Sequence, residues 1–157
     1  MRIIYALFLV LGLSIQSCQT EGKSNLVKLD LLSYGLPISI MAPEGAEIVA
    51  DDMGVWTDVT VKAGDDYYVQ IIASDAITFE KADIVAEQLK TVKASTFFSK
   101  ILEEYEDGFI YEKKIDDKLN YDFRCVKIQG DKEYIFQTGL IGTWTEENVR
   151  TMFDAVK

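Results

Sequence analysis

Few side chains in this chain could carry out catalysis. There is no histidine, which excludes the Ser-His-Asp triad, the Cys-His dyad and the HExxH zinc site. The GxSxG, P-loop and GxGxxG patterns of serine hydrolases and nucleotide-binding proteins are also missing. Two cysteines, Cys18 and Cys125, and an excess of carboxylates remain. We therefore predict no catalytic residue and favour a protein that binds over one that catalyses a reaction.

Cys18 ends a pattern typical of lipid attachment. Met1-Arg2 supplies a positive charge, and the apolar run over residues 3–13 matches a signal-peptide hydrophobic region. A membrane-spanning helix would need about 20 apolar residues. The segment Ile15-Gln16-Ser17-Cys18 resembles a lipobox, in which diacylglycerol is attached to the cysteine and the preceding peptide is removed. We predict a lipoprotein signal peptide over residues 1–17 and acyl chains, such as palmitate, on Cys18. A secretory peptide cleaved near Ser17 and an uncleaved anchor are the alternatives.

Residues 18–25 are polar and are predicted to form a tether between the lipid and a folded domain. Gln19 is not the aspartate that typically retains lipoproteins in the inner membrane, so we expect the outer membrane of the cell envelope. Acidic residues after the cysteine send some lipoproteins to the cell surface, but Glu21 alone does not decide between the surface and the periplasmic side. The membrane is thus an expected partner, through Cys18.

The net charge of the chain restricts its other partners. It is −10 at pH 7, and no stripe of basic residues could displace counterions from a phosphate backbone. We therefore expect no nucleic-acid binding. An anionic lipid surface also repels such a chain unless a covalent lipid holds it there.

The carboxylates form short groups along the chain. The pairs Asp51-Asp52, Asp65-Asp66 and Asp116-Asp117 could offer calcium ligands, but none has the ligand spacing of an EF-hand loop. We interpret them as turn formers and predict neither a metal ion nor a cofactor. The cluster Glu103-Glu104-Tyr105-Glu106-Asp107 is expected at a helix C-terminus, where it is either a partner-facing surface or a solvated helix end.

Cys125 lies in an alternating segment with Tyr121 and Phe123 on its own side. Arg124 points to the opposite face of such a strand, so no cation is expected beside the thiol. We predict a small, buried and unreactive core residue.

The elements that would position these residues follow from periodicity. Alternation and turn residues predict strands over 26–34, 36–42, 55–62, 67–73, 109–115, 119–128 and 133–141, with a short one over 46–50. Spacings of three and four predict a helix from about 79 to about 106, and Thr145 caps a second, C-terminal helix. Because the strands follow one another as hairpins, we predict one α+β domain over residues 26–157. It is a mainly antiparallel sheet of about six or seven strands flanked by two helices, an α/β/α sandwich.

One segment and this order of elements support a family resemblance. The turn in Tyr34-Gly-Leu-Pro-Ile-Ser-Ile-Met-Ala-Pro-Glu-Gly45, the long middle helix, the hairpins and the closing helix resemble PsbP-like domains over roughly residues 30–156. The resemblance implies an antiparallel sheet with helices on both sides, here in a lipoprotein of a Gram-negative, Bacteroidota-type bacterium. PsbP-like domains mostly act as binding or assembly modules.

Three functions are compatible with these features. The leading hypothesis is a membrane-anchored, non-enzymatic binding or assembly module that meets another protein of the envelope. The first alternative is a small-ligand carrier with a pocket between sheet and helix, which Phe97, Phe98, Tyr67 and Tyr68 could line. The second is an envelope hydrolase that uses a pair of carboxylates. Exposed aromatics favour the module, a pocket of several hundred Å³ favours the carrier, and two facing carboxylates favour the hydrolase.

Overall fold

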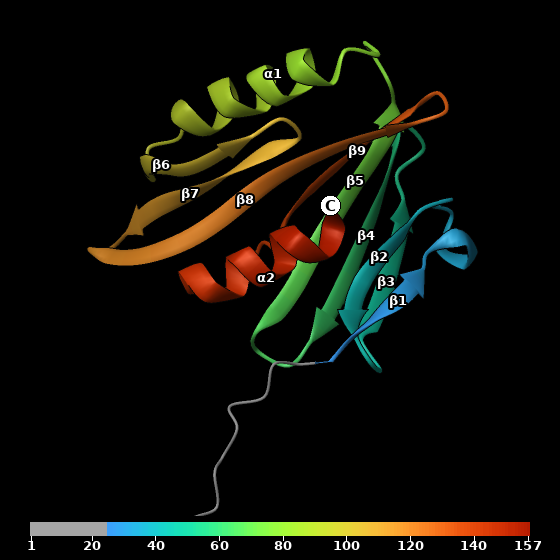
Figure 1. Ribbon diagram of the computed structural model, residues 1–157, viewed down its shortest axis with the longest axis horizontal. Helices are drawn as coiled ribbons and strands as arrows, with labels where there is room; N and C mark the ends of the chain where they lie inside the picture. The colour runs from blue at the N-terminus through green and yellow to red at the C-terminus, as the bar shows by residue number, and fades with distance from the viewer. Residues whose placement is uncertain (1–24) are drawn as a thin grey trace, which may run out of the picture.

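Alternating apolar residues build a seven-stranded antiparallel sheet, to which a two-stranded sheet and two α-helices are added (Figure 1). The computed structural model describes residues 25–157, so the predicted signal peptide and Cys18 lie outside the described residues. The elements in chain order are β1 (Leu26–Asp30), the 3₁₀ turn η1 (Leu32–Tyr34), β2 (Ser39–Pro43), β3 (Glu47–Asp52), β4 (Trp56–Ala63), β5 (Tyr67–Asp75), α1 (Lys81–Lys93), β6 (Phe98–Tyr105), β7 (Gly108–Ile115), β8 (Lys118–Gln129), β9 (Lys132–Thr138) and α2 (Glu146–Val156).

The large sheet has the order β3-β4-β5-β9-β8-β7-β6, and every neighbouring pair is antiparallel. Five of these pairings join strands that follow one another along the chain. The sixth places β9 beside β5, where Ile71 lies opposite Phe136. This pairing joins β3, β4 and β5 to the strands β6 to β9 in one sheet. The predicted α+β fold with a mainly antiparallel sheet is confirmed.

One face of the sheet carries the main apolar core. Helix α2 begins with a capping box, in which the Thr145 side chain accepts a hydrogen bond from the backbone of Asn148 and the Asn148 side chain bonds back. Its buried stripe includes Phe153, which packs on Phe123 of β8. The β1–β2 hairpin covers the same face beside α2, with Ile40 buried against it. The predicted N-cap at Thr145 is confirmed.

The opposite face is only partly covered. Helix α1 packs on β8, and its Val92 meets Phe109 and Tyr111 of β7 in a small second apolar cluster. Figure 1 shows α1 over β6, β7 and β8, away from β3 and β4. On the uncovered part of this face, Val49 and Trp56 are exposed.

The prediction of one long helix over residues 79–106 was wrong in its second half. Helix α1 ends at Lys93, and residues 98–105 form the edge strand β6. The pairing of β6 with β7 is irregular between Phe98 and Lys100 and again between Ile101 and Glu103. Such bulges insert residues into the alternation, so apolar side chains recur at a helix-like spacing along a strand.

Candidate functional site

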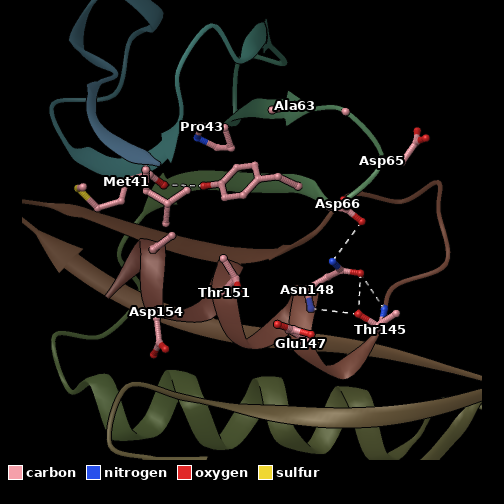
Figure 2. A pocket seen from close by; sticks show the side chains of 14 residues that line it. Met41, Pro43, Ala63, Asp65, Asp66, Thr145, Glu147, Asn148, Thr151 and Asp154 are labelled. Carbon is pink, nitrogen blue, oxygen red and sulfur yellow. Dashed lines mark hydrogen bonds between the residues drawn. The ribbon is translucent and has the colours of Figure 1, made fainter. Parts of the chain in front are cut away.

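An open groove lies between the β1–β2 hairpin, the β4–β5 turn and helix α2 (Figure 2). Its volume is about 860 Å³. Tyr67 closes one side, because its buried hydroxyl donates a 2.7 Å hydrogen bond to the Met41 carbonyl and ties β5 to β2. Burial raises the pKa of the Tyr67 phenol, so this group remains a neutral donor. This hydrogen bond therefore fixes the β1–β2 hairpin against β5 along one side of the groove.

The groove is acidic. Asp65 and Asp66 of the β4–β5 turn and Glu147 and Asp154 of α2 are among its lining residues, and in Figure 2 the carboxylates of Asp65 and Asp154 point outward from it. No lysine or arginine lines it among the residues that the structure describes. The Asn148 amide donates to the Asp66 carboxylate at 3.3 Å, which links the turn to the first turn of α2. The groove therefore combines these carboxylates with apolar lining residues, among them Leu26, Met41 and Tyr67.

The other end of the sheet carries exposed apolar side chains on two neighbouring loops. The β3–β4 turn and the β5–α1 connection lie side by side, because Trp56 pairs with Ser74 at the end of β5. Trp56 is 45% exposed, Phe79 is 69% exposed and Ile77 is 94% exposed. We call these two segments the distal loops; their exposed apolar residues are Met53, Val55, Trp56, Ile77 and Phe79.

The groove and the distal loops lie at opposite ends of the molecule. Leu26, near the start of the described chain, and Tyr67, at the start of β5, both line the groove. Strand β5 has nine residues, so it carries the chain about 30 Å from the groove to the distal loops. Figure 1 shows this as the rise of β5 from the end where β1 begins toward the connection to α1.

The predicted acidic cluster lies on a strand and a turn, not at a helix end. Glu103 and Glu104 belong to β6, and Glu106 and Asp107 form the turn before β7. Glu103 accepts hydrogen bonds from the Tyr105 hydroxyl and from Arg150 of α2, whose Nη2 lies 2.7 Å from its carboxylate. The Arg150 hydrogen bond first, and then that of Tyr105, lower the pKa of Glu103 to about 2. Glu103 therefore fastens α2 to the sheet, while its side chain stays 40% exposed.

Cys125 is a buried free thiol in β8, on the core face with Phe123, as predicted. Burial raises the pKa of this thiol to about 12, so the reactive thiolate is scarce near neutral pH.

The aromatics expected to line one pocket are separated. Tyr67 lines the groove, Tyr68 packs edge-on against Trp144, and Phe98 packs against Tyr111 on the other face of the sheet. Phe97 is exposed. The structure thus does not assemble the predicted apolar ligand pocket.

The paired aspartates lie in or beside turns. Asp116 and Asp117 both have positive φ angles, 48° and 61°, as the two central residues of the tight β7–β8 hairpin require. Within residues 25–157, no three His, Cys, Asp or Glu side chains gather where they could hold a metal ion. In the same part of the chain, no helix combines the length and apolar character needed to span a bilayer.

Sequence reasoning missed a cluster of buried charges beneath α1. Asp122 of β8 accepts hydrogen bonds from the Tyr111 hydroxyl at 2.9 Å, from the Lys113 ammonium at 2.9 Å and from the Thr138 hydroxyl at 2.8 Å. Arg124 lies 3.3 Å from the same carboxylate. Burial alone would raise the pKa of Asp122, but the charges of Arg124 and Lys113 outweigh burial and hold that pKa below its usual value. In the sequence, this cluster was indicated by two opposite charges, Asp122 and Arg124, which alternation places on one face of the strand.

Comparisons of this chain with protein-family models, with curated proteins and with solved structures found no match. The resemblance to PsbP-like domains therefore stays a prediction, and the functional conclusion depends on the geometry described above.

Proposed function

We propose that this protein is a lipoprotein of the cell envelope, anchored through Cys18, that acts without catalysis as a binding or assembly module. Its partner is another envelope protein, which docks on the distal loops. The observation that carries this proposal is the set of exposed apolar side chains at the end of the sheet remote from Leu26. A resemblance to PsbP-like domains, most of which are binding or assembly modules, supports the same function.

The distal loops have the character of a protein-binding surface. Monomeric soluble proteins rarely expose a contiguous large apolar patch, because each such side chain gains free energy when it leaves water. Trp56 can act as an anchor residue, since tryptophan is enriched among the side chains that dominate binding energy at interfaces. Because the predicted tether from Cys18 enters the domain at Leu26, the distal loops at the opposite end are left free for a protein partner.

The two alternatives receive less support. The groove of about 860 Å³ has the size of a ligand site and a partly apolar lining, but it is open to solvent, whereas a site for a small apolar molecule buries most of its ligand. For a hydrolase, a general acid requires a carboxyl group whose pKa is raised toward the working pH. The buried carboxyl group of Asp122 is shifted in the opposite direction by Arg124 and Lys113.

The anchor is tested first. Intact-mass analysis of membrane-extracted protein is expected to show the loss of residues 1–17 and the addition of acyl chains. The Cys18→Ser variant is expected to leave the membrane fraction after a salt wash, because two or three acyl chains provide the stable attachment. A Cys18→Ser protein that stays equally membrane-bound would contradict this part of the proposal.

The docking surface is tested in intact envelopes. A photo-crosslinking amino acid in place of Ile77 is expected to give one discrete adduct with another protein. The double variant Trp56→Ser and Phe79→Ser is expected to abolish that adduct, because it removes the two large aromatic contacts. The matched control places the crosslinker at Leu119, which is also an exposed apolar residue but lies at the remote end of β8.

Two results would overturn the docking surface. One is an adduct of equal yield from Leu119, and the other is an Ile77 adduct that survives the double variant. Lipid contact is measured separately, by sedimentation of the Cys18→Ser protein with vesicles of bacterial lipid. If the distal loops drive that sedimentation, they insert into a membrane and do not dock on a protein.

A further inference from the structure

A second, smaller pocket lies between the C-terminal end of α1 and the sheet, directly over the buried charges. Its volume is about 290 Å³, at the lower end of the range of small-molecule sites. Thr91, Val92 and Ser95 form its helix side, and the β9–α2 connection closes it with Gly139 and Leu140. The sheet side consists of Tyr111, Lys113, Asp122, Arg124, Gln137 and Thr138.

The charge of this pocket differs in sign from that of the whole chain. Two cations, Lys113 and Arg124, and one anion, Asp122, line it, which leaves a net charge of +1 (2 − 1) in a chain of net charge −10. Both cations are largely withdrawn from water, with side chains 21% and 16% exposed. A partly desolvated positive site of this kind attracts an anion more strongly than a surface lysine does.

The acceptor capacity of Asp122 is already in use. Its Oδ1 accepts from the Phe123 backbone at 2.8 Å and from both the backbone and the hydroxyl of Thr138. Its Oδ2 accepts from Tyr111 and Lys113. A carboxylate offers about four lone-pair positions, so Asp122 cannot accept the remaining donors of the pocket.

Several donors of the two cations are left over. Arg124 directs Nη1 to the Phe123 carbonyl at 2.8 Å and toward Asp122, and its guanidinium also interacts with the Tyr111 side chain. Its Nε and Nη2 make no hydrogen bond of normal length and angle within residues 25–157. Lys113 donates one of its three N–H groups to Asp122. The guanidinium lies 5.6 Å from the centre of the Tyr111 ring, which holds it in place. The Arg124 guanidinium and the Lys113 ammonium thus form an anion-binding arrangement, in which Asp122 is their only anionic partner among residues 25–157.

We propose that this pocket binds a small organic acid through its carboxylate. A single carboxylate supplies the one negative charge that the pocket lacks and the two oxygens that an arginine fork takes. Val92, Leu140 and the Tyr111 ring give the rest of the pocket an apolar lining for a short aliphatic tail. This site is separate from the distal loops and goes beyond the proposed docking function.

The probe is sodium butanoate, titrated into full-length protein in detergent at constant ionic strength. The readout is the NMR signal of each arginine Nε–H group, because the chain's arginines are Arg2, Arg124 and Arg150. We expect a saturable shift at Arg124 without a parallel shift at Arg150. Butanamide, which has the same shape without the charge, is expected to give no such shift, and this comparison requires no substitution that could disturb folding.

Substitutions then locate the contacts. Arg124→Gln is expected to weaken butanoate binding about tenfold or more, since it removes a charge-assisted pair of donors. Lys113→Met keeps most of the side-chain volume and is expected to weaken binding by a smaller factor. The matched control is Lys90→Gln on the exposed face of α1, where the lysine pairs with Glu87.

Four results would overturn the proposal: no saturable shift at Arg124, an equal response to butanamide, an equal response at Arg150, or unchanged affinity in a folded Arg124→Gln protein. Inorganic phosphate serves as the competing anion. If phosphate binds more tightly than butanoate, the ligand is not an organic carboxylate and the proposed class is wrong.

Discussion

The two faces of the large sheet are buried by different kinds of contact. Toward α2, the sheet presents apolar side chains such as Phe123 and Phe136, which pack against Phe153 and the β1–β2 hairpin. Toward α1, the covered strands bury a carboxylate with two cations as well as a small apolar cluster. Apolar packing is non-directional and strong, whereas a buried ion pair gains little over an apolar substitute of the same shape.

This difference indicates where stability and binding reside. The α2 face supplies most of the apolar burial and therefore most of the free energy of unfolding. The α1 face contributes less burial but carries groups with specific direction, charge and unused donors. Buried charges that add no stability are candidates for ligand binding. If so, stability depends mainly on the α2 face and binding on the α1 face.

The largest effect is expected from Phe153→Ala on α2. Phe153 is fully buried and packs on Tyr105 and Phe123, so its truncation leaves a cavity in the main core. The free energy of unfolding should fall by about 3 to 5 kcal/mol. Urea unfolding measures this, with Phe98→Ala in the partly exposed α1 cluster as the counterpart. If both variants lose the same stability, the two faces do not differ as described.

Asp122→Asn should cost about 3 kcal/mol, because Lys113 and Arg124 then lose the charge that compensates them. The folded-state pKa of Asp122 lies below its usual value of 3.8, so its stabilisation is complete above that value and is lost as pH falls through the lower, folded-state pKa. Urea unfolding from pH 7 to pH 2 should show the stability difference between wild type and variant shrinking only below about pH 3.8. A difference that stays constant to pH 2 would show that Asp122 is not held ionised by the cluster.

A smaller effect is expected at Glu103, where α2 is fastened to β6. Its pKa is about 2 in the folded protein against 4.5 ordinarily, so its contribution to stability is present above pH 4.5 and disappears as pH falls to about 2. Glu103→Gln should flatten the pH dependence of unfolding in that window. Glu104→Gln is the control, because Glu104 is exposed and forms no ion pair within the described chain. Equal flattening by both substitutions would rule out the Arg150 contact as its cause.

The smallest effect on stability is expected at the distal loops. Trp56→Ser and Phe79→Ser alter side chains that are 45% and 69% exposed, so the free energy of unfolding should fall by about 1 kcal/mol or less each. Thermal unfolding measures this beside the crosslinking assay. A large loss of stability would mean that these aromatics belong to the core and would remove the basis of the docking surface.

Much of the fold follows from the order of residues alone. Alternation predicted β4 and β5, the paired aspartates predicted the β7–β8 hairpin, and Thr145 predicted the start of α2, because each signal acts between residues close in sequence. The burial of Cys125 was also predictable, since apolar Tyr121 and Phe123 precede it at every second position.

Only the tertiary structure decided the rest. The bulges in β6 gave an edge strand the spacing of a helix, and its pairing with β7 overrode that local pattern. The placement of β9 beside β5 joins residues far apart in the sequence, for instance Ile71 and Phe136, and no local pattern records such a pairing. The cluster around Asp122 needs β7, β8 and the end of β9 side by side, because its charges are stable in the interior only when all of them meet.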